Sequence, residues 1–468
     1  MSELWRLDAT DLARLIRLGR ASAREATQSV LGRMDVVNPI TNGVVQQFAN
    51  EALAAADAAD AKQARGEALG VLHGVPVTIK VNIDQAGHAT TNGVVALKDW
   101  VAQEDSPVVA NFRAAGAIIV GRTNTPAFSM RLFTDNALHG RTVNPLDPGI
   151  SPGGSSGGAG VSIATGVGPI AHGNDIAGSV RVPAYCNGVV GLRVGLGRIA
   201  AFNPSQPVAR PITAQLMAVQ GPLTRTVRDA RLALAVMARG DARDTRWVDA
   251  PLVGPPPARP LRVALVPNLP GGFTHPAQSA AVRTAGRHLA AAGYVVEEVL
   301  PPDLEQVIDL WAAFGSADVL APLGPRMEEM GDEAGKLSMR HWLALQPPGD
   351  LKSVLAALAL RDLLLQRWQT FFIHTQLVVM PSLGDLPPPV DQDLTLEGQR
   401  KVLNSIRAAL PAPVLGLCGL AVPVGRHGAL RTGVQITTAR FREDLALDAG
   451  EVIEAAEGVV QPVDPVKL

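Results

Sequence analysis

The sequence predicts a single large α/β domain, because short apolar strands alternate with helical segments along most of its 468 residues. Hydrophobic residues make up 47% of the chain and charged residues 18%, a balance typical of a globular protein with a large core. A chain of this length buries such a core without disulfides or metals. We therefore expect one α/β sheet protein rather than several small domains.

The first 66 residues are predicted to be a helical segment packed on the core. Apolar residues recur at helical spacing over Leu7–Leu18 and Ala23–Val36, and Glu51–Arg65 is rich in alanine, a strong helix former. Ser22, with Glu25 three positions later, forms a capping-box pattern that marks the start of the second helix.

From residue 67 to residue 468 the pattern changes to strands that alternate with helices. Val75–Val81 is a short β-branched run introduced by glycine and proline, and Ala117–Val120 is a second such run after a helix at Ser106–Ala115. The further helices are expected at Gly160–Thr165, Thr224–Ala238, Pro276–Ala292 and Leu445–Gly458. The further strands are expected at Gly168–Ala171, Leu261–Pro267, Leu377–Pro381, Val414–Val424 and Gly433–Ile436. A mostly helical insertion is expected around 304–372, a linker at Val253–Pro260 and a loop at Pro387–Pro389.

The net charge and the cysteine content indicate which binding partners and which cellular compartment to expect. A formal net charge of -1 and the absence of an arginine run argue against nucleic-acid or anionic-membrane binding. Cys186 and Cys418 occur in no metal-binding spacing and are interpreted as free thiols. Asp8, Asp11 and Arg14 interrupt the apolar residues near the start, and we expect no apolar stretch long enough to cross a membrane. We expect a cytoplasmic protein for a small-molecule substrate, without metal or cofactor; a homodimer is compatible with it.

Two glycine-rich segments, 153–158 and 173–184, indicate a site where backbone approaches a ligand. A flexible loop is the simplest alternative on composition. A phosphate-binding loop is disfavoured because no Gly-Lys-Ser/Thr follows. The G-x-S-x-G match at 153–157 is typical of a nucleophile elbow, but the elbow follows a strand, and Pro148 and Pro152 precede this match.

Taken together, these residues resemble the amidase signature family. The resemblance rests on the Gly-Gly-Ser-Ser-Gly-Gly segment, on Gly173–Ala184 and on four further segments: Gly74–Lys80, Gly121–Asn124, Gly191–Arg193 and Gly433–Ile436. It covers the chain from about Leu72 to Ile436. It implies an amidase-signature fold in residues 67–468, with a large mixed central β-sheet flanked on both faces by helices, in one domain.

The resemblance also implies roles for single residues. Ser179 matches the nucleophile, Ser155 the bridging serine after a cis peptide bond from Gly154, and Lys80 the buried base. The backbone donors of the oxyanion hole are implied at Ile176, Ala177, Gly178 and Ser179, and Asp175 and Arg181 match polar positions that support the loop. A lysine acts as a base only when it is neutral, and burial lowers its pKa. The apolar strand before Lys80 suits that need, so His73, His139 and His172 are assigned only local hydrogen bonds.

Four positions depart from the family text. Val81 replaces an aspartate, which removes a carboxylate near Lys80; Asn174 replaces a threonine or serine; Ala177 replaces a glycine, so its φ should be negative; and Val194-Gly195 replaces Pro-Thr. These departures affect substrate preference and loop shape rather than reaction type.

The substrate pocket is expected from the stretch 128–134, with Ser129, Met130, Arg131, Phe133 and Thr134 as its lining. Two aromatic residues and a methionine in this stretch favour an apolar or aromatic acyl group. We expect Arg131 to face solvent, and the large residues of the helical insertion to pack in the core.

Three functions remain open from the sequence. The first is an amidase that hydrolyses small, mainly apolar carboxamides, anilides or hydrazides through an acyl-enzyme on Ser179. The second is the glutamine-hydrolysing subunit of a tRNA-dependent amidotransferase, which needs charged pocket residues for glutamine. The third is a non-catalytic binding protein on the same fold, disfavoured because Lys80, Ser155 and Ser179 are all present.

Overall fold

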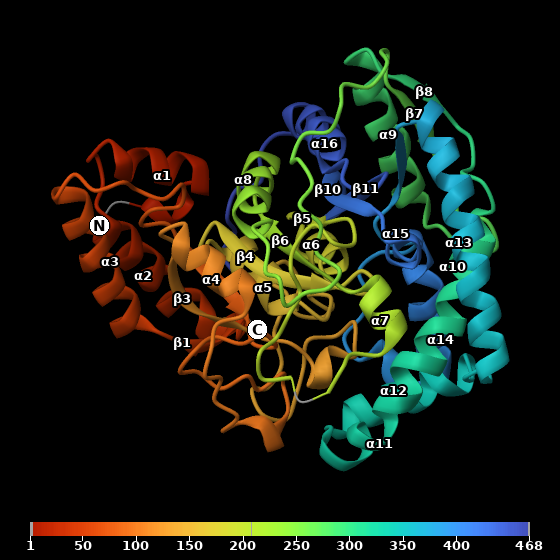
Figure 1. Cartoon of the computed structure of the whole chain (residues 1–468), viewed down its shortest axis with the longest axis horizontal. Helices are drawn as coiled ribbons and strands as arrows, with labels where there is room; N and C mark the ends of the chain where they lie inside the picture. Colours follow the sequence, from red (N-terminus) through yellow and green to blue (C-terminus); the bar gives the residue numbers. More distant parts are fainter. Residues whose placement is uncertain (1–2, 207, 467–468) are drawn as a thin grey trace.

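The computed structural model, which describes residues 3–206 and 208–466, is built around one eleven-stranded sheet (Figure 1). The strands are β1 (Val44–Gln47), β2 (Pro76–Lys80), β3 (Ile118–Thr123), β4 (Ile170–Asp175), β5 (Val190–Arg193), β6 (Val219–Thr224), β7 (Arg262–Leu265), β8 (Val295–Glu297), β9 (Leu377–Pro381), β10 (Cys418–His427) and β11 (Leu430–Thr438). Their order is β1-β3-β2-β4-β6-β5-β10-β11-β9-β7-β8.

The sheet is mixed, as the resemblance implied. β2 runs parallel to β3 and β4, and β7 runs parallel to β8 and β9. The remaining neighbours are antiparallel. The carboxyl ends of β2 and β4 therefore reach the same edge of the sheet, where ligand sites of α/β proteins form.

Sixteen α-helices accompany the strands in the described residues. They are α1 (Ala9–Arg17), α2 (Ala23–Thr41), α3 (Ala49–Ala64), α4 (Pro107–Ala114), α5 (Gly157–Thr165), α6 (Arg181–Asn187), α7 (Ile212–Met217), α8 (Val227–Met237), α9 (Pro276–Ala291), α10 (Leu304–Phe314), α11 (Ala321–Met330), α12 (Glu333–Leu345), α13 (Leu351–His374), α14 (Leu396–Ser405), α15 (Pro411–Leu415) and α16 (Glu443–Glu457). Ser22 caps α2, and the capping box with Glu25 is present as predicted.

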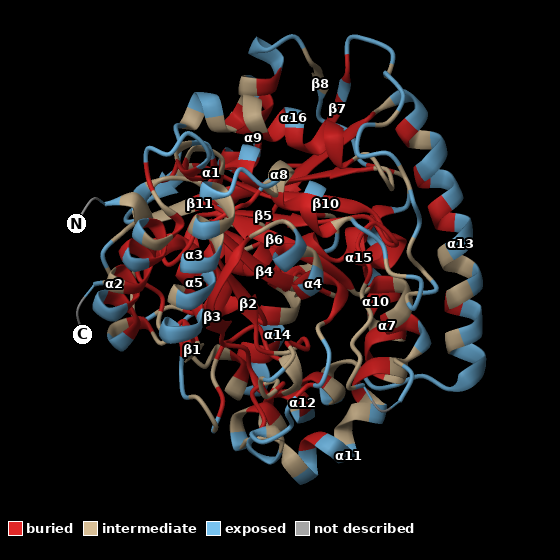
Figure 2. Ribbon diagram, turned by 60° about the vertical axis from the view of Figure 1, so that its left-hand side comes forward, coloured by how far each residue is buried: buried red, intermediate tan, exposed pale blue. Residues whose placement is uncertain are grey.

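Helices cover both faces of the sheet. Successive residues of a strand point to opposite faces. Ile170 and Leu420 pack in one apolar cluster with residues of α8, α9 and α16, whereas the next residues along, Ala171 and Ala421, pack in another cluster with α5 and α6. The predicted α/β sheet with helices on both faces is thus confirmed, and Figure 2 shows the buried residues concentrated in and beside the sheet.

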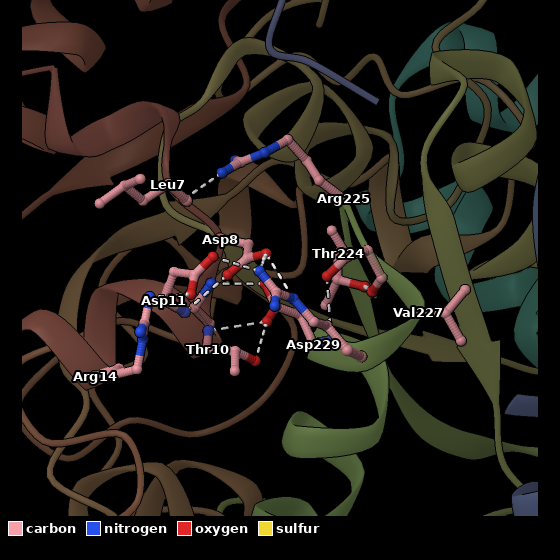
Figure 3. A network of polar contacts seen from close by, with 12 residues as sticks. Leu7, Asp8, Thr10, Asp11, Arg14, Thr224, Arg225, Val227 and Asp229 are labelled. Atoms are coloured by element: carbon pink, nitrogen blue, oxygen red, sulfur yellow. Dashed lines mark hydrogen bonds and ion pairs between the residues drawn. The ribbon is translucent and has the colours of Figure 1, made fainter. Parts of the chain in front are cut away.

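The N-terminal segment adds a strand that its helical pattern did not predict. β1 lies between α2 and α3 and pairs antiparallel with β3 at the edge of the sheet. Helix α1 is also fixed to the core, because the buried Asp229 of α8 accepts hydrogen bonds from Ala9 N at 2.6 Å and from Thr10 N at 3.0 Å (Figure 3). Arg228 of the same helix pairs with Asp8 and Asp11. A carboxylate at the N-terminus of a helix stabilises it, because it is attracted to the partial positive charge there.

The helical insertion contains the longest apolar helical run. The π-helical turn Gly315–Leu320 joins α10 to α11, and the combined helix Leu304–Met330 is long and apolar enough to span a membrane by length and composition. The expectation that no stretch passes this test is corrected. Half of the apolar window is buried inside the protein, and α10 packs on α13 and α15. Core packing accounts for its composition. Trp311, Phe314 and Trp368 are buried there, as expected.

Candidate active site

Lys80 is the last residue of β2, which lies between β3 and β4 in the sheet, and its side chain is fully buried. Its Nζ lies 2.7 Å from Ser155 Oγ and 3.0 Å from Ser156 Oγ. The third partner is Asn174 Oδ1 at 2.9 Å. Because β4 runs parallel to β2, Asn174 near the end of β4 lies beside the end of β2. The sheet topology therefore brings Asn174 to the lysine.

Burial lowers the pKa of Lys80 well below its usual value near 10.5, although the charge of Asp175 opposes this shift. A neutral amine has two N–H donors and one lone pair. Asn174 Oδ1 can only accept a hydrogen bond, so one N–H points to it. Of the two serine hydroxyls, one must donate to the lone pair, and Ser155 has the shorter contact. This pattern leaves Ser155 Oγ ready to accept a proton from a second hydroxyl.

The lowered pKa of Lys80 has a direct kinetic consequence. The base is the neutral amine, which exists above the pKa of Lys80 in the folded protein and is lost as the pH falls through it. We expect kcat/KM for a neutral amide to rise with pH along a limb whose midpoint lies well below 10.5, and then to level off. A rate profile between pH 5 and 10.5 checks this; a limb centred on the ordinary lysine value contradicts it.

Ser155 belongs to a tightly packed loop before α5. The Gly154–Ser155 peptide bond is cis, as the resemblance implied. A Cβ on Gly154 would lie 2.4 Å from the carbonyl oxygen of Arg131, so only glycine fits there. Thr134 Oγ1 donates to Gly153 O at 2.9 Å and accepts from Gly157 N at 3.1 Å. Thr134 thus holds the loop together, and it does not border the cavity beside the two serines.

Ser179 lies in the loop between β4 and α6, just before the helix begins at Arg181. Ser179 and Asp175 are both buried. Asp175 accepts from Gly178 N at 2.9 Å and Val180 N at 3.2 Å, on either side of Ser179. It also pairs with Arg181 and Arg193 at 3.0 and 3.2 Å. Burial alone raises the pKa of Asp175, but the two guanidinium groups outweigh burial and lower it. The carboxylate therefore stays charged and holds the loop.

Three backbone donors around Ser179 remain open in the described residues. The N–H groups of Ile176, Ala177 and Ser179 have no hydrogen-bond partner there, whereas Gly178 N is engaged by Asp175. The implied set of four donors is therefore reduced to three. Gly178 has a φ of 109°, which favours glycine, and Ala177 is not among the residues of positive φ, as expected.

Replacing Asp175 by asparagine tests this anchor. The change leaves Arg181 and Arg193 buried without their counter-charge, and breaking a buried pair typically costs about 3–5 kcal/mol. We expect a lower Tm together with a fall in kcat, because the loop around Ser179 loses its anchor. Glu443→Gln is the matched control, since Glu443 forms a similarly buried pair with Arg198. An unchanged kcat in the Asp175→Asn protein would show that Asp175 is not needed to hold the loop around Ser179.

A cavity of about 190 Å³ opens in front of the two serines. Ser155 and Ser179 line it, whereas Lys80 lies behind them. The other walls are mostly apolar and amide side chains, with one serine, one aspartate and one arginine, from β4, the segments that follow β2 and β3, and the chain leading to and forming β6. These lining residues are Asn82, Ile83, Ser129, Met130, Asn174, Asp175, Ile176, Ala201, Phe202, Asn203, Gln206, Arg210, Ala218, Val219 and Gln220.

Two of the five residues predicted to line the substrate pocket border this cavity. Ser129 and Met130 line the cavity, but Arg131, Phe133 and Thr134 do not. The expectation that Arg131 faces solvent is wrong: its side chain is 1% exposed and binds Asp393 through two hydrogen bonds of 2.7 and 2.8 Å. Phe133 is buried in an apolar cluster. The sequence did not indicate this pairing, because Asp393 lies 262 positions after Arg131 in the chain.

An amide network extends from Lys80 across the cavity wall. Asn174 and Asn82 exchange hydrogen bonds of 3.0 and 3.2 Å, and Asn82 Nδ2 also donates to Ser129 Oγ at 3.0 Å. The departure at Asn174 therefore contacts the lysine directly, whereas the sequence analysis expected it to affect substrate preference and loop shape. Ser156 was likewise missed as a partner of Lys80.

Histidine takes only supporting roles. His172 Nδ1 accepts from the backbone N of Lys80 at 3.4 Å, and its Nε2 donates to Gln220 Oε1 at 2.7 Å. Burial lowers the pKa of His172 to about 3, so it is neutral. His139 bonds Thr91 at 2.9 Å. In the described part of the chain, no group of three or more His, Cys, Asp or Glu side chains is arranged to hold a metal ion. Cys186 and Cys418 are buried free thiols.

A lysine kept neutral by burial, a serine bonded to it and a second serine beside open backbone donors form the arrangement that a serine hydrolase requires. Comparison with known proteins narrows the class. The chain belongs to the amidase family, whose model matches residues 25–447. It is therefore an amidase, an enzyme that hydrolyses the C–N bond of amides.

Two relatives and one solved structure illustrate the similarity. The chain is 46% identical to an indoleacetamide hydrolase of Bradyrhizobium diazoefficiens over 98% of this chain and 88% of that protein. It is 33% identical to an acylamidase of Rhodococcus erythropolis over 96% and 95% of the two chains. The structure of a 6-aminohexanoate cyclic dimer hydrolase complexed with substrate superimposes with a TM-score of 0.84 at 27% identity, over 98% of each chain.

Proposed function

We propose that this amidase hydrolyses small carboxamides with an apolar or aromatic acyl group, through an acyl-enzyme on Ser179. The observation that carries the proposal is the cavity, where Ser155 and Ser179 face apolar and aromatic walls such as Phe202 and Met130. The similarity to an indoleacetamide hydrolase supports a flat aromatic acyl group.

The proposed reaction begins with attack of Ser179 Oγ on the amide carbonyl carbon. The proton of Ser179 passes to Ser155 Oγ while the proton of Ser155 passes to Lys80 Nζ, which the 2.7 Å contact permits. The N–H groups of Ile176, Ala177 and Ser179 stabilise the oxyanion, and one such donor is typically worth about 2.7–4 kcal/mol of barrier.

Collapse of the tetrahedral intermediate breaks the C–N bond. The leaving nitrogen takes its proton from Ser155, which regains one from the Lys80 ammonium, and ammonia or an amine departs. Water then repeats the sequence on the acyl-enzyme: Lys80, through Ser155, accepts a proton from the water, and Ser179 Oγ leaves as the hydroxyl. The carboxylic acid is released and the three side chains return to their starting protonation.

The cavity argues against the amidotransferase function. Glutamine carries an ammonium group beside its carboxylate, and an ammonium is best held by a carboxylate. Asp175 is the single acidic residue among the described lining residues, and Arg181 and Arg193 already neutralise it. The complete arrangement of Lys80, Ser155 and the open donors argues against a non-catalytic protein.

An activity panel tests the proposal. The purified chain is given indole-3-acetamide, phenylacetamide, acetanilide and glutamine, and release of ammonia or aniline is measured. We expect the aryl acetamides to have a kcat/KM at least about a hundredfold above glutamine, a difference that contacts with an apolar pocket of this kind can supply. Preferred hydrolysis of glutamine, or no hydrolysis of any amide, contradicts the proposal.

A further inference from the structure

Among the described lining residues of the catalytic cavity, Arg210 alone carries a charge that is not held in an ion pair; it also borders a neighbouring cavity. The guanidinium of Arg210 has no ion pair or hydrogen bond with any residue that the structure describes. By contrast, the fully buried arginines of this chain each reach a carboxylate or carbonyl: Arg122, Arg131, Arg181, Arg193 and Arg198. Arg210 is half-buried, and burial lowers its pKa, which shows that desolvation of its charge is only partly offset.

The backbone that carries Arg210 is held firmly. Gln215 Nε2 donates to the carbonyl oxygen of Arg210 at 2.7 Å. Asp318, in the π-helical turn of the insertion, accepts from Thr213 N at 2.7 Å and from Thr213 Oγ1 at 2.6 Å, at the start of α7. Hydrogen bonds of two residues that follow Arg210, Thr213 and Gln215, thus hold its backbone in place.

The preceding lining residues are fixed as well. The buried Asp84 accepts from Ser205 N at 2.6 Å and donates its own N–H to Asn203 Oδ1 at 2.8 Å. Asp244 accepts from Ala201 N at 2.7 Å. Phe202 and Asn203 are therefore held in the cavity wall on the same segment that leads to Arg210. The charge of Asp244 attracts the Arg210 guanidinium, but its carboxylate accepts hydrogen bonds from the backbone N–H groups of Ala201 and Arg246 and forms no ion pair with Arg210.

The described cavity wall holds one acidic and one basic residue, Asp175 and Arg210, and only Asp175 is engaged in ion pairs. Asp175 is shared by two arginines, burial lowers the pKa of Lys80 well below its usual value, and Arg210 adds a positive charge. A planar guanidinium pairs best with a carboxylate, through two parallel hydrogen bonds. Desolvation in a cavity strengthens such a pair relative to one at the surface.

From this arrangement we propose that Arg210 binds a carboxylate on the substrate, at a position away from the amide that Ser179 attacks. The inference rests on the proposed amidase reaction and adds a substrate class to it: amides that carry a carboxylate beyond an apolar or aromatic middle section. The carboxylate belongs either to the acyl part or to the amine part of the amide, and the two sources are separated by the choice of probes.

Binding measured without turnover tests the proposal directly. In the Ser179→Ala protein, dissociation constants are compared for phenylacetamide and 4-(carbamoylmethyl)benzoate, and for acetanilide and 4-acetamidobenzoate. The first pair places the carboxylate on the acyl side and the second on the amine side. We expect the charged member of one pair to bind at least about tenfold more tightly, and the preference to weaken with added salt.

Arg210→Met in the same background is expected to remove this preference. Arg246→Met is the matched control, because Arg246 lines a neighbouring cavity but not the catalytic one, and the preference should persist. Equal binding within both pairs, no binding of either charged amide at millimolar concentration, or a preference that survives Arg210→Met overturns the proposal. Turnover of the neutral amides by the unmodified enzyme reports separately on the proposed function.

Discussion

Replacing Ser179 by alanine should give a folded protein without measurable amide turnover. Ser179 Oγ is the proposed nucleophile. Among the described serines that line the cavity, Ser155 is the one in contact with Lys80. Loss of a serine nucleophile in comparable enzymes lowers kcat by about 10⁴-fold or more. Because alanine removes one oxygen atom, we expect the Tm and the circular dichroism spectrum to stay close to those of the unmodified enzyme.

Ser162→Ala is the matched control for this change. Ser162 is also a buried serine, in α5, and its Oγ donates to the carbonyl oxygen of Ala159 at 2.9 Å, away from the cavity. It should keep kcat within a small factor. Substantial turnover by a folded Ser179→Ala protein is the result that rules out the proposed nucleophile.

Replacing Lys80 by alanine should be nearly as severe. The neutral amine is the only group in contact with Ser155 that is able to take its proton, since Ser155 has no histidine or carboxylate partner in the described residues. General-base catalysis typically contributes about 10²–10⁴ to the rate. We expect kcat to fall by at least that factor, and the rising limb of the pH profile to disappear.

A small amine should partly restore the Lys80→Ala protein. The substitution leaves a polar space bounded by Ser155, Ser156 and Asn174, which previously bound Nζ. Added methylamine should raise the rate in a saturable way, and its neutral form should be the active one. Rescue is not expected for Ser179→Ala. A Lys80→Ala protein with ordinary activity would mean that another group acts as the base.

The fold was predictable where apolar periodicity is strong. β2, β3, β7 and β9 are short apolar runs, and each was expected within a few residues of its place. β6 was missed because its sequence, Val-Gln-Gly-Pro-Leu-Thr, is typical of a turn. Pairing with β4 and β5 on its two sides makes it a strand. α6 was missed because Pro183 lies within its first turn, where a helix tolerates proline.

Only those site residues that belong to sequence motifs were predictable from the sequence. Lys80, Ser155 and Ser179 lie in segments whose glycine spacing resembles a known family, and the structure places Lys80 in contact with Ser155 and both serines on one cavity. No sequence motif marks Phe202, Asn203 and Arg210 as residues of the cavity wall. Anchors distant in sequence, such as Asp84 and Asp318, bring these residues to the cavity. The cytoplasmic location and a homodimer stay predictions.

The most direct test of the account is to locate the acyl group during turnover. The enzyme is mixed with phenylacetamide, quenched in acid within the steady state, digested and analysed by mass spectrometry. The account predicts a phenylacetyl adduct on the peptide that contains Ser179, and none in the Ser179→Ala protein. An adduct on Ser155 or Ser156 instead, or turnover with no acylated serine under conditions that trap one, would contradict it.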